Sequence, residues 1–123
     1  MPLREEQREA ALEPLRRRNF ETVLERLAAC GAVRGELLDV GCAHGWFLDA
    51  ARRRGYVASG IEPDAAIAAQ AVRRGHTVTH GRFPQALPAG VRFDVIVFND
   101  VFEHLPDPRG ALGAVHAALR PGG

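Results

Sequence analysis

The spacing of apolar residues divides the chain into helical and extended segments that alternate along most of its length. Residues 3–13 form a polar helical stretch, and Pro14 is expected to end it because proline lacks the N–H that a helix interior requires. A second helix is expected over residues 20–30, where Phe20 and Leu27 belong to an apolar face with helical spacing. The chain is therefore predicted to begin with two helices.

Short strands and helices are expected to alternate after this N-terminal region. Alternation of this kind forms a parallel sheet with right-handed crossovers, so the predicted fold class is α/β, with helices on both faces of about four strands. The last predicted strand is almost wholly apolar, as in a strand that is covered on both faces. Strands are expected at residues 36–40, 56–61, 77–79 and 93–98, and helices at residues 46–54 and 65–74 and from residue 108 onwards.

The last helix is expected to begin at Pro108, with Asp107 as its N-cap, and to end before Pro121. Nothing in the sequence marks an interdomain linker or an internal repeat, and 123 residues fit one domain. We therefore predict a helical segment at residues 1–34 and one α/β domain at residues 35–123. The buried face of the last helix is predicted to hold Ala111, Leu112, Val115 and Leu119.

The composition argues against several classes of function. A net charge of +1 is too small for the electrostatic footprint of a nucleic-acid-binding protein, and no apolar run approaches the roughly 20 residues of a membrane span. The charged N-terminus does not look like a signal peptide. Cys30 and Cys42 lack the spacing of a disulfide framework or a zinc site, and His76 and His80 have no third ligand beside them. We expect a cytoplasmic protein without a metal site.

The turn after the first strand carries the clearest chemical signal. Small residues stand at every second position, Gly41, Ala43 and Gly45, and they let a ligand approach the backbone closely. The helix that follows offers unpaired N–H groups at its start. Asp39 places a negative charge at the carboxyl end of the strand, the edge at which parallel sheets bind ligands. Cys42, within the turn, is expected to be a small filler rather than a reactive thiol.

Glu62 ends the second strand, 21 residues after Gly41. A carboxylate there accepts both hydroxyls of a ribose, and the spacing suits a dinucleotide or a nucleoside without telling the two apart. The glycine pattern separates them, because a dinucleotide fingerprint needs a third glycine for close helix–strand packing and Trp46 occupies that position. The sequence thus favours a nucleoside ligand over a dinucleotide, and an NAD-dependent oxidoreductase is the less favoured alternative.

The pattern D-x-G-x-A-x-G of residues 39–45 resembles motif I of class I S-adenosylmethionine-dependent methyltransferases, with Ala43 in place of the middle glycine. The resemblance covers residues 35–123. It implies a Rossmann-like fold, S-adenosylmethionine as the cofactor and transfer of a methyl group to an acceptor. Three further segments resemble the family in the right order: SGIEPD at residues 59–64, FDVIVFNDVFEHL at residues 93–105 and LRPGG at residues 119–123.

The resemblance also implies roles for single residues. The family places Asp39 and the turn against the methionine part of the cofactor, Glu62 at the ribose hydroxyls and Pro63 near the adenine. Arg82 and Phe83 stand where many relatives have an acidic residue for the adenine amino group, so a contact from Phe83 is expected instead. The residues expected to bind the cofactor are Asp39, Gly41, Cys42, Ala43, Gly45, Glu62, Pro63, Phe83 and Asn99.

Methyltransferases of this family normally have seven strands, whereas the four predicted here end where a fifth would begin. We therefore expect a truncated chain whose apolar strand at residues 93–98 lies at an open edge and promotes self-association. His104 is the candidate general base, and the alternative is that it belongs to a structural turn. A small-molecule acceptor is expected, because no basic surface suggests nucleic acid. A non-catalytic S-adenosylmethionine-binding fragment is the alternative function.

Overall fold

The computed structural model describes residues 5–98 and 105–123, and in the first helix it describes side chains only from Pro14 on, Arg16 excepted. The bounds of the elements lie within two residues of the predicted ones everywhere after that helix. The helices are α1 (Glu5–Ala29), α2 (Trp46–Arg53), α3 (Ala65–Arg73) and α4 (Pro108–Ala118), and the strands are β1 (Gly35–Val40), β2 (Tyr56–Glu62), β3 (Thr77–His80) and β4 (Val95–Phe98).

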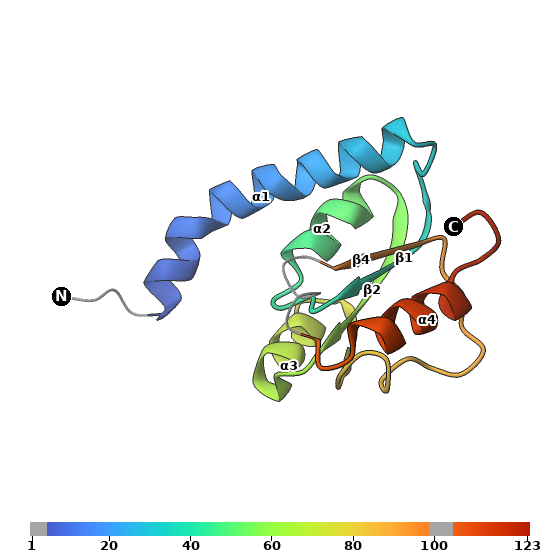
Figure 1. Ribbon diagram of the computed structural model, residues 1–123. Coiled ribbons are helices and arrows are strands. Elements are labelled where there is room, and N and C mark those ends of the chain that lie inside the picture. Colours follow the sequence, from blue (N-terminus) through green and yellow to red (C-terminus); the bar gives the residue numbers. More distant parts are fainter. Residues whose placement is uncertain (1–4, 99–104) are drawn as a thin grey trace.

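The strands form one parallel sheet in the order β3-β2-β1-β4. β1 is paired on both sides, with Leu37 opposite Ala58 of β2 and Val95 of β4. α1 and α2 cover one face of the sheet, and α4 covers the other (Figure 1). This arrangement confirms the predicted Rossmann-like α/β class, in which the carboxyl ends of the strands share one edge.

Side chains of β1 and β4 alternate between two cores, one on each face of the sheet. In β1, Leu37 belongs to the core under α1 and α2, whereas Leu38 belongs to the core under α4. In β4, Val95 and Ile96 divide between the same two cores. The strands therefore need apolar groups on both faces, which explains why the last strand is an almost continuous apolar run.

The predicted break at Pro14 is wrong, because α1 runs through it without interruption. Pro14 and Leu15 are exposed, so water reaches the helix at the point where proline removes a hydrogen bond. An interior proline costs a helix roughly 3 kcal/mol, which burial elsewhere along the helix has to offset. Farther along, Leu24 is fully buried, and Phe20 packs edge-on against Phe47 of α2 with ring centroids 5.3 Å apart. This packing anchors the C-terminal half of α1.

α4 begins as predicted, because the Asp107 carboxylate accepts a hydrogen bond from the Gly110 N–H at 3.0 Å. Its predicted buried face is right for Ala111 and wrong for Leu112, which is 56% exposed. The buried stripe runs from Ala111 to Ala118, and a side chain one position on from Ala111 is rotated by about 100° away from it. In the described part of the chain, no helix combines the length and the apolar character needed to cross a membrane.

β4 starts two residues later than predicted, at Val95. The Phe93 N–H instead donates to the Ala118 carbonyl at 2.7 Å, and the Arg120 N–H donates to the Phe93 carbonyl at 2.8 Å. The segment after α4 thus lies alongside the entry to β4. Among the described residues, Val95–Phe98 forms an edge of the sheet, as the sequence led us to expect.

A charged cluster holds the amino end of the sheet together. Asp94 Oδ2 accepts a hydrogen bond from the Glu36 N–H at 2.8 Å and another from Arg120 Nη1 at 2.8 Å. Arg120 Nη2 donates to Glu36 Oε2 at 2.7 Å. Gly35 makes room for this carboxylate, because a Cβ at that position would lie 2.5 Å from Asp94 Oδ2. The cluster therefore ties β1, the entry to β4 and the segment after α4 to one another.

We predict that Asp94→Ala lowers the free energy of unfolding by about 1–2 kcal/mol, because the Glu36 N–H and Arg120 both lose an acceptor in a half-buried position. Asp94→Asn keeps one oxygen for the Glu36 N–H and should cost less. Urea unfolding followed by circular dichroism measures both variants. A wild-type unfolding curve for Asp94→Ala would contradict this role for the cluster.

Candidate functional site

Residues 41–45, which we call the glycine turn, connect β1 to α2 at the carboxyl edge of the sheet. The N–H groups of Gly41 and Cys42 both donate to the carbonyl of Ile61 in β2, at 2.8 and 3.1 Å. The chain therefore bends over the end of β2 as soon as β1 ends. The two segments that the sequence singled out lie side by side at this edge.

Glu62 is buried, and two backbone N–H groups orient its carboxylate. Oε1 accepts from the Ala43 N–H at 3.0 Å, and Oε2 accepts from the Asp64 N–H at 2.9 Å. The first bond joins β2 to the glycine turn, and the second leads into α3, whose N-cap is Asp64. Each carboxylate oxygen has two lone pairs, so each retains one for a hydrogen bond from a ligand.

The backbone of the glycine turn is left-handed at three positions, with φ of 77° at Gly41, 49° at Ala43 and 89° at Gly45. Glycine adopts this region freely, whereas alanine there costs about 1–2 kcal/mol. The sequence interpretation explained the small residues by ligand clearance alone, and the structure adds this conformational reason. The hydrogen bond from the Ala43 N–H to Glu62 helps to hold the strained residue in place.

The thiol of Cys42 is buried against β2, where a Cβ on Gly60 would collide with the sulfur. Burial, reinforced by the negative charges of Asp39 and Glu62, raises the pKa of the Cys42 thiol to about 12. The thiol is thus a packing group at neutral pH. The same two carboxylates, both almost wholly buried, make the electrostatic potential beside the glycine turn negative.

A cavity of about 1040 Å³ opens at this edge of the sheet. Small-molecule pockets typically measure roughly 300–1,000 Å³, so this one has room for a cofactor and part of a second molecule. In the described part of its wall, the carboxylates are those of Asp39, Glu62 and Asp107, and the guanidinium is that of Arg82. The predicted cofactor-binding residues that line it are Asp39, Gly41, Cys42, Ala43, Glu62, Pro63 and Phe83.

Three predicted site residues are not part of the described lining. Gly45 caps the start of α2 and is not among the described lining residues, and Asn99 and His104 lie outside the described residues. Phe83 is buried and packs edge-on against Phe98 at 5.3 Å, so it anchors its loop as well as lining the cavity. Among the side chains that the structure describes, no three His, Cys, Asp or Glu residues lie close enough together to hold a metal ion.

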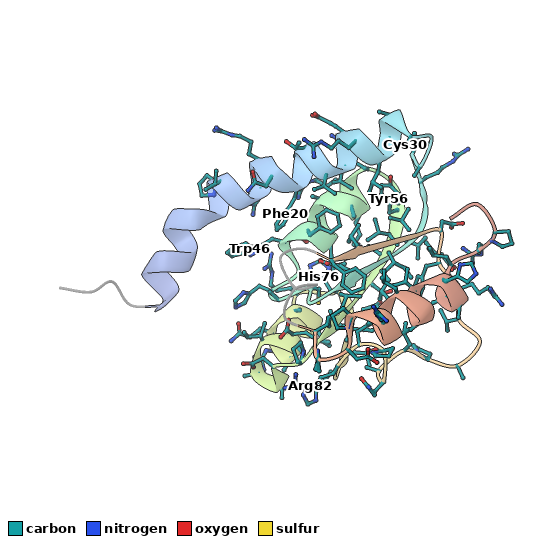
Figure 2. The ribbon with its side chains drawn as sticks, in the orientation of Figure 1. Phe20, Cys30, Trp46, Tyr56, His76 and Arg82 are labelled. Atoms are coloured by element: carbon teal, nitrogen blue, oxygen red, sulfur yellow. The ribbon has the colours of Figure 1, made fainter. Side chains whose placement is uncertain are left out.

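One wall of the cavity was not predicted from the sequence. It comes from α1, through Asn19, Phe20 and Val23, and from Trp46 at the start of α2. Figure 2 shows Phe20 and Trp46 in the region where α1 crosses the start of α2. Trp46 stacks on His44, with ring centroids 5.7 Å apart and planes 25° apart. Helical spacing marked Phe20 as buried, but only the packing of α1 across α2 makes that face a cavity wall.

Comparison with known proteins gives a family match over almost the whole chain: a family model described as "Methyltransferase domain" matches residues 6–123. The chain is 35% identical over 97 residues to the ubiquinone biosynthesis O-methyltransferase of Azotobacter vinelandii, covering 72% of this chain and 41% of that protein. For the same enzyme of Psychrobacter arcticus, the identity is 32% over 108 residues, covering 80% and 42%. The chain thus spans about two fifths of the length of these curated relatives.

Solved structures share the fold. An amino pentose methyltransferase from Micromonospora echinaspora, solved with bound S-adenosylmethionine, has a TM-score of 0.75 and 27% identity, covering 98% of this chain and 54% of that chain. The magnesium protoporphyrin IX methyltransferase of Synechocystis has a TM-score of 0.72 over 97% of this chain and 61% of its own, and its 16% identity supports the fold alone. On the family match and the shared fold together, this chain belongs to the methyltransferase domain family.

Proposed function

We propose that this chain is the S-adenosylmethionine-binding part of a methyltransferase that acts on a small-molecule acceptor. The observation that carries the proposal is the hydrogen bond between Glu62 and the Ala43 N–H, which puts a carboxylate suited to a ribose beside the glycine turn in one cavity. Membership of the methyltransferase domain family supports it. So does the 27% identical neighbour that was solved with bound S-adenosylmethionine.

The charge of the cavity favours an adenosyl sulfonium over a dinucleotide. S-Adenosylmethionine carries a positive sulfonium and an ammonium group, which the carboxylates of Asp39 and Glu62 attract. A dinucleotide instead presents a negative pyrophosphate to a turn of this kind, and the buried charge of Asp39 repels it. Trp46 also occupies the position where the dinucleotide fingerprint has its third glycine. An NAD-dependent oxidoreductase is therefore the weaker alternative.

Each predicted residue has a role in the proposed site. Asp39 and the glycine turn hold the methionine part of the cofactor, and the lone pairs that Glu62 retains accept the ribose hydroxyls. Pro63 is exposed beside the cavity and Phe83 lies in its wall, so we assign both to the adenine side. The Gly81 N–H donates to the Glu62 carbonyl at 3.0 Å, which keeps the loop that carries Phe83 at the end of β2.

The chemistry divides between the cofactor and the chain. When bound, the cofactor supplies the methyl group and the sulfur leaving group of an in-line displacement. The chain supplies orientation, and the wall formed by Phe20 and Trp46 is our proposed place for the acceptor. A general base is needed only for an acceptor that loses a proton, and His104 is our candidate for it. Asn99 is assigned to the side of the transferred methyl group.

A small-molecule acceptor agrees with the names of the relatives, which include a ubiquinone biosynthesis O-methyltransferase and an amino pentose methyltransferase. The net charge of +1 gives no support to a nucleic-acid substrate. We propose that residues 1–34 close one side of the cavity and that residues 35–123 hold the cofactor. Two free cysteines suit the reducing cytoplasm in which we place the protein.

A non-catalytic S-adenosylmethionine-binding fragment is the second candidate function. The observation behind it is that the described lining residues account for binding of the cofactor, whereas the candidate base His104 lies outside the described residues. Binding of S-adenosylhomocysteine without methyl transfer to any acceptor would support this candidate over the first. A thermal-shift comparison of S-adenosylhomocysteine with NADH separates both from an oxidoreductase, because only the true cofactor raises the melting temperature.

We predict that Glu62→Gln weakens binding of S-adenosylhomocysteine by about 10–100-fold, the equivalent of roughly 1.5–3 kcal/mol for a hydrogen bond to a charged group. The amide nitrogen of glutamine cannot accept a hydrogen bond, so one of the backbone or ribose donors loses its partner. Isothermal titration calorimetry measures the change.

The matched control is Glu25→Gln, the same substitution at an α1 side chain that is 69% exposed. It should leave the affinity for S-adenosylhomocysteine unchanged. The proposed site fails if the wild-type chain does not bind the ligand, or if Glu62→Gln binds it as tightly as Glu25→Gln does.

The high pKa of Cys42 predicts that its thiol stays unreactive in the native protein. With a pKa of about 12 the thiolate is scarce at pH 8, and reactivity should rise only as the pH approaches that value. In the variant Cys30→Ser, which removes the exposed thiol, a disulfide reagent such as dithiobisnitrobenzoate should modify Cys42 only after denaturation. Rapid modification of Cys42 in the native variant below pH 9 would contradict the buried environment assigned to its thiol.

We also propose that the chain self-associates through β4, because this strand is an edge of the sheet among the described residues and the backbone groups of an edge strand can pair with a second chain. Sedimentation velocity should show an average mass that increases with protein concentration. A monomer at every concentration up to a few hundred micromolar would rule this out.

A further inference from the structure

Residues 74–76, which we call the α3–β3 corner, attach to both α2 and the glycine turn. Arg74 Nη2 donates to Asp49 Oδ2 of α2 at 2.8 Å, and Arg74 Nη1 donates to the His44 carbonyl at 3.2 Å. Arg52 of α2 donates to the Gly75 carbonyl at 3.3 Å. The corner therefore reaches the first turn of α2 and the middle of the glycine turn through separate contacts.

The side chain of His76 is only 1% exposed and packs against the end of the glycine turn. A Cβ on Gly45 would lie 2.5 Å from the His76 Cδ2 atom, so the ring occupies the space that a larger residue at position 45 would need. Figure 2 shows His76 between α2 and α3. His76 Nε2 lies 2.9 Å from Asp49 Oδ1, close enough for an ion pair when the ring is protonated, whereas Nδ1 has no hydrogen-bond partner in the described part of the chain. Such buried polar groups are uncommon, so the ring is held here for its shape and position.

We propose that His76 is a positioning residue for cofactor binding: its ring, pressed against Gly45, holds the glycine turn and the first turn of α2 where they meet the cofactor. This inference rests on the proposed function. Gly45 is not among the described residues that line the cavity, and its lack of a side chain leaves room for the His76 ring and suits its left-handed backbone. His76 acts on the site through Gly45 and through the pair of Asp49 and Arg74.

The position of the ring makes the site sensitive to pH. Burial lowers the pKa of His76 below its ordinary value of 6.5, Arg52 and Arg74 act in the same direction, and Asp49 opposes them. The folded state keeps the ring neutral, so its stabilising contribution is complete above pH 6.5. That contribution is lost as the pH falls from 6.5 towards the lower pKa of the folded state. Protonation puts an N–H on Nδ1, which has no hydrogen-bond partner in the described part of the chain, and adds a positive charge near Arg52 and Arg74, so it loosens the corner.

The experiment measures binding of S-adenosylhomocysteine by calorimetry at pH 7.5 and pH 5.5, and the amide resonance of Gly45 by NMR across the same range. His76→Ala removes the ring and should weaken binding about tenfold at pH 7.5, since small displacements of binding groups have effects of this size. His76→Phe keeps a ring that cannot be protonated and should bind nearly as well as wild type at pH 7.5, with a smaller loss at pH 5.5. His116→Ala, at an exposed position of α4, is the matched control and should behave as wild type.

Below pH 6.5 the Gly45 amide resonance should shift by more in the wild type and in His116→Ala than in His76→Phe, which retains His44 and His80. If circular dichroism shows that His76→Ala does not fold, the His76→Phe variant and the Gly45 titration test the inference instead. The inference is overturned if the wild type binds S-adenosylhomocysteine while His76→Phe shows the same pH profile and the same Gly45 titration. A wild type that does not bind the ligand refutes the proposed function, whereas the Gly45 titration still reports on His76.

Discussion

The hydrogen bond from the Ala43 N–H to the Glu62 carboxylate is the contact on which the candidate site depends. Parallel pairing of β1 with β2 brings the ends of the two strands to one edge, but pairing alone does not fix the distance between a turn and a side chain. Here the turn is first held by the carbonyl of Ile61 and then by the side chain that follows it. The backbone of the glycine turn and the Glu62 carboxylate therefore hold each other in place, and the carboxylate keeps lone pairs that can accept hydrogen bonds from a ligand.

The small residues at this edge are small for different structural reasons, although they form one pattern in the sequence. Gly41 and Ala43 have left-handed backbones and line the cavity. Gly60 leaves room for the sulfur of Cys42, and Gly45 leaves room for the ring of His76. Clearance for a ligand is thus one of several reasons for small side chains here. The others concern how β2 and the α3–β3 corner pack beneath the turn.

Much of the fold could be predicted from the sequence, because its signals are local. Apolar runs predicted the strands, their alternation with helices predicted a parallel sheet, and the N-cap Asp107 marked the start of the last helix. The continuity of α1 through Pro14 could not be predicted, since it depends on the exposure of that residue in the folded chain. The sequence motifs identified the site residues at the ends of β1 and β2. They did not identify the wall that contains Phe20 and Trp46, because that wall depends on how α1 crosses α2. Tertiary packing, which no local pattern encodes, accounts for that difference.

The most direct test of the account is a crystal structure of this chain with S-adenosylhomocysteine. The account predicts both ribose hydroxyls within hydrogen-bond distance of the Glu62 oxygens, while the Ala43 N–H remains bonded to the same carboxylate. A ligand bound away from Glu62, or a Glu62 side chain turned out of the cavity in the complex, would contradict it.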